Sequence, residues 1–492
     1  MTFPIPFDNT YAQLPGRFFT PTLPTPVSAP RLIRVNQPLA VHLGIDPDRL
    51  GSDEGLQILA GNRVPENARS ISTAYAGHQF GGFVPQLGDG RAILLGEVID
   101  RSGVRRDIQL KGAGPTPFSR RGDGRAALGP VLREYVASEA MAALGIPTTR
   151  ALAAVSTGDP VYREEILPGA VLTRVAASHI RVGTFQFFAS REDTEGVRLL
   201  ADHVIARHYP AAAEAENPYR ALLDAVIRAQ ASLIAQWLLV GFVHGVMNTD
   251  NVSVAGETID YGPCAFLDEY DPGAVWSAID RGGRYAYGNQ SAIGEWNLIR
   301  LAECFLPLLS DDPKNGVPQA QEALGAYANA FQTAYQGGMR QKLGLSTQHE
   351  DDTALGRDIL DVMAANEADF TLTFRRLGDA ALGPQNDDAI RALFLNPSAF
   401  DVWAVRWRKR HEKEAISPVA RQAAMRSVNP AFIPRNHRVE AMIRAAVDRD
   451  DFSPFEEMLT VLAQPFKDQE EFARYAEPPG NDERVRQTFC GT

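Results

Sequence analysis

The sequence predicts a mixed α/β (α+β) fold with two lobes and a cleft between them. Between residues 77 and 123, short apolar runs alternate with glycines, as is typical of strands joined by tight turns. A wide apolar stripe along Tyr219–Phe242 predicts a long buried helix. From about Leu298 onward the apolar spacing is helical, with breaks near Pro313 and Gly383.

The chain divides into three predicted parts. Residues 1–190 hold a proline-rich N-terminal extension with short helices, followed by a sheet-rich lobe with a glycine loop. Residues 191–310 form the core of a second lobe, and residues 311–492 are a helical extension that ends in a cysteine-bearing tail. With 492 residues and 45% hydrophobic content, the chain can bury the cores of two lobes.

Charge and cysteine content exclude several classes of protein. The net charge of −11 argues against a nucleic-acid partner, so any anionic ligand must be held by local cations. The three cysteines form no CxxC pair, which argues against a zinc site and suits a reducing compartment. The stretch Leu233–Met247 is too short to span a membrane, and residues 1–15 lack an apolar signal segment. We therefore expect a cytoplasmic protein without a membrane partner.

The first lobe is predicted to carry Lys111 on a hairpin and Glu134 on a helix, two charged residues that could form an ion pair. Ala92–Val98 and Arg106–Lys111, joined by turn residues, predict a hairpin with Lys111 at its end, on the face opposite Ile108 and Leu110. The predicted helix Val131–Leu144 carries Glu134. Further strands are predicted near Ala151–Val155 and Gly169–Val175.

The strongest chemical signal follows the long helix. His244 to Asn251 form a loop, and Val252–Val254 and Thr258–Asp260 predict a short hairpin that brings Asn251 next to Asp260. Amide and carboxylate oxygens are suitable ligands for Mg²⁺ on nucleotide phosphates. Protein kinases use this layout, with an Asn from one loop and an Asp from the following Asp-x-Gly. The alternative is that both residues only cap a tight turn.

Upstream segments supply the other parts of a nucleotide site in the expected order. Gly88-Asp89-Gly90-Arg91 is a glycine loop before the first hairpin strand, and a strand Lys paired with a helix Glu holds a phosphate-binding ammonium in kinase-like lobes. The basic loop Arg120–Arg125 could bind a polyphosphate through amides and guanidinium groups. Arg174 and Arg181 could also face the cleft. Taken singly, each of these residues is better explained by a turn or a surface position, and only the order of the parts favours the functional interpretation.

One residue of the kinase pattern is missing. The carboxylate that orients the accepting hydroxyl lies five positions before the Asn in kinases, and here that position is Val246. Valine cannot accept a proton. Asp250 is the nearest substitute carboxylate, and a loop-capping role for it weighs about equally.

These motifs resemble the selenoprotein O family. The resemblance rests on Gly88–Arg91, Ile108–Arg120, His244–Asn251 and Asp260–Pro263, and it extends over nearly the whole chain. It implies a protein-kinase-like bilobal pseudokinase fold that binds ATP in a flipped orientation and transfers AMP to Ser, Thr or Tyr hydroxyls of proteins, itself included, with release of pyrophosphate.

The resemblance also implies roles for individual residues. Asp250 is the implied proton acceptor, Asn251 and Asp260 are implied ligands of Mg²⁺ or Mn²⁺, and Glu134 holds the catalytic Lys111. The implied contacts with ATP are Gly88, Gly90, Arg91, Lys111, Asp123, Gly124, Arg174, Arg181 and Asp260. UMP transfer with Mn²⁺ is reported for some family members and stays open here.

The tail carries a further implied feature. The family has a cysteine or selenocysteine third from the end, where this chain has Cys490. A bond to Cys264 would suggest redox control, whereas Trp276 stands in the stretch where some relatives have the partner cysteine. The alternative is a free surface thiol.

Two other functions compete with AMP transfer. A small-molecule or protein kinase would share the His-Gly…Asn loop, but Val246 argues against it. A non-catalytic ATP-binding scaffold would not need both Asn251 and Asp260 for a divalent cation.

Overall fold

The computed structural model describes residues 5–488. Its N-terminal half is built on an antiparallel sheet of eight strands in the order β1-β3-β6-β7-β10-β9-β2, with β8 paired to β10. The strands are β1 Phe19–Pro21, β2 Arg31–Val35, β3 Ile71–Thr73, β6 Ala92–Ile99, β7 Arg105–Lys111, β8 Ala126–Ala127, β9 Arg150–Tyr162 and β10 Ile166–Ala176.

The structure confirms the predicted strands of this sheet. β6 and β7 form the expected hairpin, in which Ala92 pairs with Lys111 and the Asp100 carboxylate accepts bonds from the turn amides of Ser102 and Val104. The predicted strands near residues 151–155 and 169–175 are parts of β9 and β10. The N-terminal extension supplies the expected short helices and, beyond the prediction, the two edge strands β1 and β2.

Helices cover both faces of the sheet. On one face, α1 (Gln37–His42), α2 (Pro47–Leu50) and α3 (Asp53–Leu59) share an apolar core with Ile93, Leu95, Ile108 and Leu110. On the other face lies α4 (Leu128–Ala143), which confirms the predicted helix around Glu134 and packs on β9 and β10. Lys111 lies on the α4 side, as its alternation with Ile108 and Leu110 predicts.

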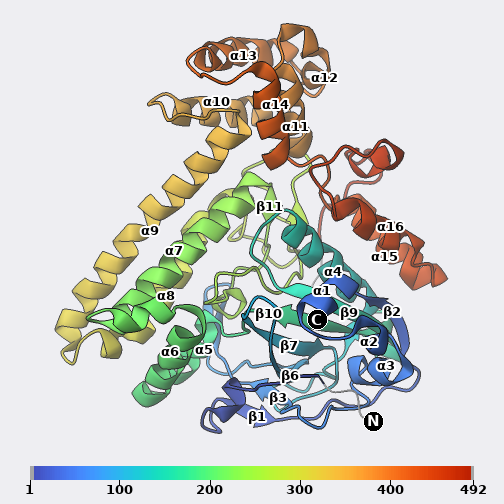
Figure 1. Cartoon of the computed structure of the whole chain (residues 1–492), viewed down its shortest axis with the longest axis vertical. Helices are drawn as coiled ribbons and strands as arrows, with labels where there is room; N and C mark the ends of the chain where they lie inside the picture. The colour runs from blue at the N-terminus through green and yellow to red at the C-terminus, as the bar shows by residue number, and fades with distance from the viewer. Residues whose placement is uncertain (1–4, 489–492) are drawn as a thin grey trace.

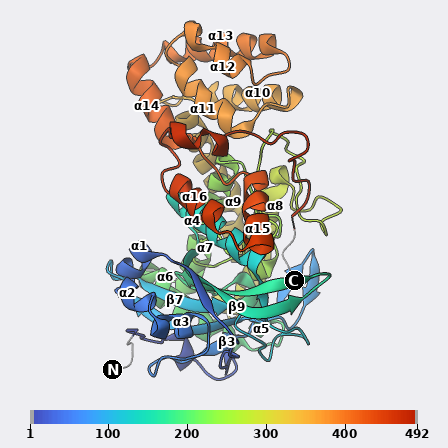
Figure 2. The same ribbon diagram turned by 90° about the vertical axis from the view of Figure 1, so that its right-hand side faces the viewer.

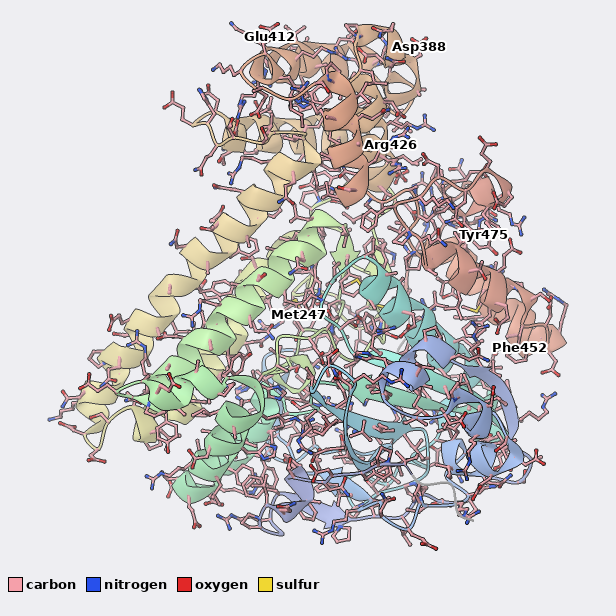
Figure 3. All side chains as sticks on the ribbon, in the orientation of Figure 1. Met247, Asp388, Glu412, Arg426, Phe452 and Tyr475 are labelled. Atoms are coloured by element: carbon pink, nitrogen blue, oxygen red, sulfur yellow. The ribbon has the colours of Figure 1, made fainter. Side chains whose placement is uncertain are left out.

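The second half is helical. α7 (Pro218–Leu239) packs on α8 (Gln290–Leu309) and α9 (Pro313–Lys342), and α5 (Val182–Ala189) and α6 (Thr194–His208) lie beside the sheet (Figure 1). By length and composition α7 could cross a membrane, but 61% of its most apolar window is buried inside the fold, as in a core helix. The loop after α7 runs through the middle of the molecule, where the labelled Met247 lies (Figure 3).

The hairpin predicted for residues 252–260 is wrong. Ser253 bridges to Arg181, and Thr258 bridges to Thr148, so the two segments pair with different partners. The apolar-polar alternation in each segment is real, but residues 148 and 181, earlier in the chain, supply the neighbouring backbone. Two strand pairs were not predicted: the short hairpin of β4 (Gly77–Gln79) with β5 (Gly82–Val84), and β11 (Phe242–Val243) with β12 (Ala265–Phe266).

The C-terminal helices separate into two groups. One group forms the end of the molecule distant from the sheet (Figure 1) and contains α10 Asp352–Ala365, α11 Phe370–Ala380, α12 Asp388–Arg391, α13 Pro397–His411 and α14 Pro418–Val428. The other, α15 (Asn436–Arg449) and α16 (Ser453–Leu462), returns to the first half and packs on α4 (Figures 1 and 2). The sequence contained no signal for this return.

Replacing Leu223 of α7 with Ala is expected to destabilise the helical half. The side chain is 0% exposed, so the variant leaves a cavity and lowers the free energy of unfolding by about 2–5 kcal/mol. Chemical denaturation followed by circular dichroism measures the change. The matched control is Leu395→Ala, because Leu395 is 74% exposed and its loss should be nearly neutral. Equal effects of the two substitutions would contradict the assignment of α7 to the core.

Candidate active site

A cavity of about 330 Å³ lies where the sheet meets the loops after α7. This volume lies within the range of ligand sites. The side chains that line it include more cations than acids: Arg91, Lys111, Arg120, Arg174 and Arg181 against Asp89, Asp250 and Asp260. In a chain of net charge −11, the cavity is therefore a local cationic region suited to an anionic ligand.

The predicted pairing of Lys111 with Glu134 is present. Lys111 Nζ lies 2.5 Å from Glu134 Oε2 and 3.5 Å from Asp260 Oδ1. Arg174, from β10, contacts the same two carboxylates, at 3.2 Å from Glu134 and 2.5 Å from Asp260. Burial lowers the pKa of Lys111, and the two cations hold the pKa of Glu134 below its ordinary value despite burial. The four groups thus form one charged network across the cavity wall.

Asp260 is at the centre of this network. Its second oxygen, Oδ2, lies 2.6 Å from Arg181 Nη1, so both oxygens face guanidinium groups. Arg181, Arg174 and Lys111 together hold the pKa of Asp260 well below its ordinary range, although burial opposes this. Asp260 also has a left-handed backbone, with φ of 62°, which is rare for a residue other than glycine and is found at functional positions.

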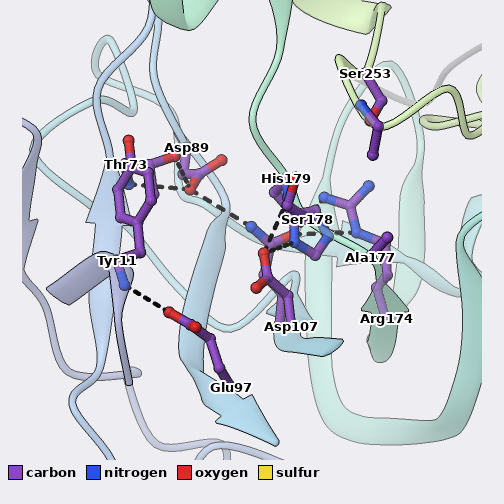
Figure 4. A network of polar contacts seen from close by, with 12 residues as sticks. Tyr11, Thr73, Asp89, Glu97, Asp107, Arg174, Ala177, Ser178, His179 and Ser253 are labelled. Carbon is purple, nitrogen blue, oxygen red and sulfur yellow. Dashed lines mark hydrogen bonds and ion pairs between the residues drawn. The ribbon is translucent and has the colours of Figure 1, made fainter. Parts of the chain in front are cut away.

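The segment that joins Arg174 to Arg181 is anchored on both sides. The backbone N–H of Ala177 donates to the Glu257 carboxylate at 2.8 Å, and His179 contacts Asp107 at 2.9 Å through its ring and its backbone N–H. Figure 4 shows the His179–Asp107 contact beside Arg174. These buried anchors fix the two arginines relative to the sheet, so neither guanidinium has to be ordered when a ligand binds.

Asp250 lies in the short 3₁₀ helix Thr249–Asn251 and is 7% exposed. Gln79 Nε2 donates to its Oδ2 at 3.0 Å, whereas its Oδ1 is buried and has no hydrogen-bond partner within residues 5–488. Burial raises the pKa of Asp250 from 3.8 to about 6. A carboxylate with a free oxygen and a raised pKa beside a cavity is suited to accept a proton.

The β4–β5 hairpin that carries Gln79 was not recognised from the sequence. The Thr249 hydroxyl accepts a bond from the His78 amide at 2.6 Å, and Asn248 Oδ1 accepts one from the Phe80 amide at 3.0 Å. The hairpin therefore lies directly over Asp250. The sequence does contain a signal for this hairpin, the pair Gly81-Gly82 at its turn. At Gly77 an added Cβ would lie 2.6 Å from Asp250 Oδ1, so the hairpin packs directly on this carboxylate.

Asn251 and Asp260 line the same cavity although the hairpin predicted to join them does not exist. Asn251 Nδ2 donates to the Val246 carbonyl at 3.0 Å, and this bond fixes the orientation of the Asn251 side-chain amide in the cavity wall. In residues 5–488 no group of three or more His, Cys, Asp or Glu side chains is arranged to hold a metal. The donors are nonetheless hard oxygens of the kind that Mg²⁺ and Mn²⁺ bind together with nucleotide phosphates.

Not every predicted nucleotide contact reaches the cavity. Gly90 and Arg91 line it, but Gly88 is packed against the Phe118 ring, with φ of 92° and only 2.4 Å between an added Cβ and the ring. Asp89, also in this loop, is buried and accepts bonds from Thr73, as Figure 4 shows. The predicted role of Gly88 as a nucleotide contact stays a prediction.

The basic loop at residues 120–125 contributes one arginine to the cavity, Arg120. Asp123 pairs with Arg163 at 2.8 Å, and Gly124 packs against the backbone of Gly114, so neither residue is among those that line the cavity. Their predicted contacts with a nucleotide also stay predictions.

Of the predicted redox pair, the structure describes Cys264. Cys264 is buried and forms no disulfide within residues 5–488, and burial raises the pKa of its thiol to about 12. Cys490 lies outside the described residues. The tail before it reaches this region, because the Thr488 hydroxyl donates to the Pro263 carbonyl at 2.8 Å and the Thr488 amide donates to the Trp276 carbonyl at 2.9 Å.

Comparison with known proteins identifies close relatives. The model of the family described as Protein adenylyltransferase SelO matches residues 2–463. The chain is 68% identical over 492 residues to a protein of Rhodopseudomonas palustris (strain HaA2) named Protein nucleotidyltransferase YdiU, with all of both chains covered. It is 66% identical over 498 residues to the protein of the same name from Methylorubrum extorquens (strain PA1), again with both chains covered in full.

Replacing Glu257 with Gln is expected to make stability less dependent on pH. Burial raises the pKa of Glu257 from 4.5 to about 7, so the folded state binds its proton more tightly than the unfolded state. The stabilisation this gives is complete below pH 4.5 and is lost as pH rises through about 7. Between pH 5 and pH 8, the free energy of unfolding of the wild-type protein should therefore fall by about 2 kcal/mol relative to that of Glu257→Gln.

Thermal or chemical denaturation across this pH range measures the difference. Glu412→Gln is the control, because Glu412 is exposed and its replacement should give a nearly constant difference at all pH values. A constant difference for Glu257→Gln as well would show that Glu257 is solvated rather than buried.

Proposed function

The chain belongs to the SelO family of protein adenylyltransferases, and we propose that it transfers AMP from ATP to Ser, Thr or Tyr hydroxyls of proteins. As a member of this family it is a nucleotidyltransferase, an enzyme that takes a nucleotide substrate and a protein target. The observation that carries the proposal for this site is Asp250: a buried carboxylate with one unpartnered oxygen beside a cationic cavity, where the position of the kinase base is Val246.

The proposed architecture is that of a protein-kinase-like pseudokinase. Residues 1–190 would be the extension and N-terminal lobe, 191–310 the core of the second lobe, and 311–492 its helical extension. The strand Lys111 paired with the helix residue Glu134, and Asn251 beside Asp260, support this assignment because kinases use the same parts in the same order.

In the proposed complex, ATP occupies the cationic cavity with its phosphates on Lys111, Arg174 and Arg181. These groups are held in place before ATP binds, so they neutralise phosphate charge without reorganising. Gly90 and Arg91, which precede the residue paired with Lys111, also line the cavity and would contact the nucleotide. A flipped nucleotide, with its α-phosphorus toward the acceptor, is consistent with a base at Asp250 rather than at residue 246.

Asn251 and Asp260 are the residues proposed to hold Mg²⁺ or Mn²⁺. Both residues line the cavity, and their amide and carboxylate oxygens are hard donors of the kind that these cations bind, which supports the fit. A bound divalent cation supplies charge neutralisation on the phosphates. The salt bridges from Arg174 and Arg181 keep Asp260 ionised, the state that a metal ligand requires.

The proposed reaction is an in-line displacement at the α-phosphorus. The acceptor hydroxyl gives its proton to Asp250 as its oxygen forms the bond to phosphorus, and the bond from phosphorus to the pyrophosphate oxygen breaks. AMP is then esterified to the protein, and pyrophosphate leaves with the electron pair. Gln79, which donates to Asp250 Oδ2, leaves Oδ1 as the oxygen that takes the proton.

The proposed setting is the cytoplasm. Its reducing conditions suit the buried thiols of Cys264 and Cys304, which form no disulfide within residues 5–488, and ATP is available there.

Isotope transfer from labelled ATP tests the reaction. With a protein mixture as acceptor, label from α-labelled ATP should become protein-bound and label from γ-labelled ATP should not. Asp260→Asn keeps the side-chain shape but removes the charge that Lys111, Arg174 and Arg181 surround, so it should reduce transfer by at least about 100-fold. EDTA should abolish transfer, and α-labelled UTP with Mn²⁺ tests the alternative donor. Transfer of γ-label would identify a kinase and refute the proposal.

Asp250→Asn should separate ATP binding from transfer. The variant keeps an oxygen and the side-chain volume but cannot accept a proton, so transfer should fall by about 10²–10⁴-fold. The affinity for ATP, measured by calorimetry, should change little because the Asp250 side chain bonds to Gln79, while its contact with Arg181 is through the backbone carbonyl, which the variant keeps. If transfer survives at the wild-type rate, Asp250 is not the base. If neither form transfers label although both bind ATP, the chain is a non-catalytic scaffold.

A further inference from the structure

The segment 435–475, called here the C-terminal arm, contacts α4, which carries Glu134, and β12, which follows Asp260 in the chain. It holds α15, α16 and the 3₁₀ helix Glu470–Tyr475. Figures 1 and 2 show α15 and α16 alongside α4, with the sheet on the other side of α4. In Figure 3 the labelled Phe452 marks the turn between the two helices. The arm therefore covers the face of α4 that points away from the sheet.

The first end of α15 is fixed to β12, the strand that follows Asp260. Asn436 Oδ1 accepts a bond from the Phe266 amide at 3.2 Å, and its Nδ2 donates to the Phe266 carbonyl at 2.8 Å. The preceding residue, Arg435, is 1% exposed and contacts Asp268 at 2.9 Å and Asp369 at 2.6 Å. These bonds join α15 to the chain just beyond the Asp-Tyr-Gly motif.

The middle of α15 is fixed to α4. Glu440 forms an ion pair with Arg133, the residue immediately before Glu134. Arg133 faces the arm while Glu134 faces Lys111, because successive residues on a helix point about 100° apart. One helix turn earlier, α4 and α15 approach so closely that an added Cβ at Gly129 would lie 2.9 Å from Ile443 Cγ2.

Apolar packing also joins α4 to the arm. Val131 and Tyr135 of α4 share one buried core with Met442 of α15 and Phe455 of α16, and the Tyr135 and Phe455 rings lie 5.3 Å apart. Within this contact, Arg133 is 8% exposed, so loss of Glu440 would leave a buried guanidinium without this ion-pair partner.

We propose that the C-terminal arm sets the spacing between Glu134 and Asp260, and that Glu440 and Asn436 are positioning residues for the nucleotide site. α15 is a single helix with one end bonded to the Asp260 side and its middle bonded to the Glu134 side. Lys111 and Arg174 each bind both carboxylates, so their positions depend on this spacing. Without the arm, α4 can move away from the cavity and Lys111 loses Glu134 as a partner.

Hydrogen exchange of the nucleotide-free protein tests the arm directly. Glu440→Gln should increase amide exchange in α4 around Arg133 and Glu134. Asp450→Asn is the matched control: it removes an ion pair of the same arm, but that pair joins Arg31 of β2 and not α4. Glu440→Asp keeps the charge and should exchange like the wild type. Unchanged exchange in Glu440→Gln would overturn the proposal, as would equal changes in Glu440→Gln and Asp450→Asn.

The second readout is the affinity for ATP, and this part of the test rests on the proposed function. Glu440→Gln should weaken binding several-fold, up to about tenfold, and Glu134→Gln should weaken it at least as much. In the double variant the loss should equal that of Glu134→Gln alone, because Glu440 acts through Glu134. Full additivity would indicate only general destabilisation and would overturn the proposal. If the wild-type protein binds no ATP while Glu440→Gln increases amide exchange in α4 as expected, the role of the arm is supported and the proposed function is refuted.

Discussion

The carboxylate of Asp260 lies within hydrogen-bond or ion-pair distance of three cations from the first lobe, Lys111, Arg174 and Arg181. Each of these cations is almost fully removed from water, and a buried charge without a partner is strongly destabilising. The loop after α7 therefore has to close against the sheet with Asp260 in one position. The left-handed backbone at Asp260 is consistent with this constraint, because the surrounding contacts determine the conformation.

Much of the surrounding structure serves to keep these cations in place. Gln109 of β7 accepts bonds from the Arg174 guanidinium, while Glu257 and the Asp107–His179 pair hold the segment between the two arginines. The same arrangement that stabilises the interface between the halves also prepares a cationic cavity. Binding of an anionic ligand would relieve the excess of positive charge there without a change of side-chain positions.

Asp250 and Asp260, two of the three acids that line the cavity, have opposite electrostatic settings. Asp260 is surrounded by cations and stays ionised, whereas Asp250 is desolvated beneath the β4–β5 hairpin and its pKa rises to about 6. Divergent environments of this kind separate a permanently charged ligand-binding carboxylate from one that can exchange a proton near neutral pH. A valine at position 246 is compatible with this division, because Asp250 lies close by on the same loop.

The sequence by itself determined the local elements and most of the residues of the site. An apolar run identified β6, period-two alternation identified β7 and the side of the sheet on which Lys111 lies, and the apolar stripe identified α7, because these signals depend only on neighbours in the chain. The motifs Gly88–Arg91, Ile108–Arg120, His244–Asn251 and Asp260–Pro263 carried the resemblance to a known family, which the family comparison confirmed.

Only the tertiary structure decided what pairs across the chain. Residues 252–260 bridge to Arg181 and Thr148 instead of to each other, Gln79 lies over Asp250, and the helices α15 and α16 return to α4. Each of these contacts joins segments far apart in the sequence, and their formation depends on complementary surfaces that no single segment encodes. Composition and periodicity report which residues will be buried, but the partner of each buried polar group is fixed only when the whole chain has closed around it.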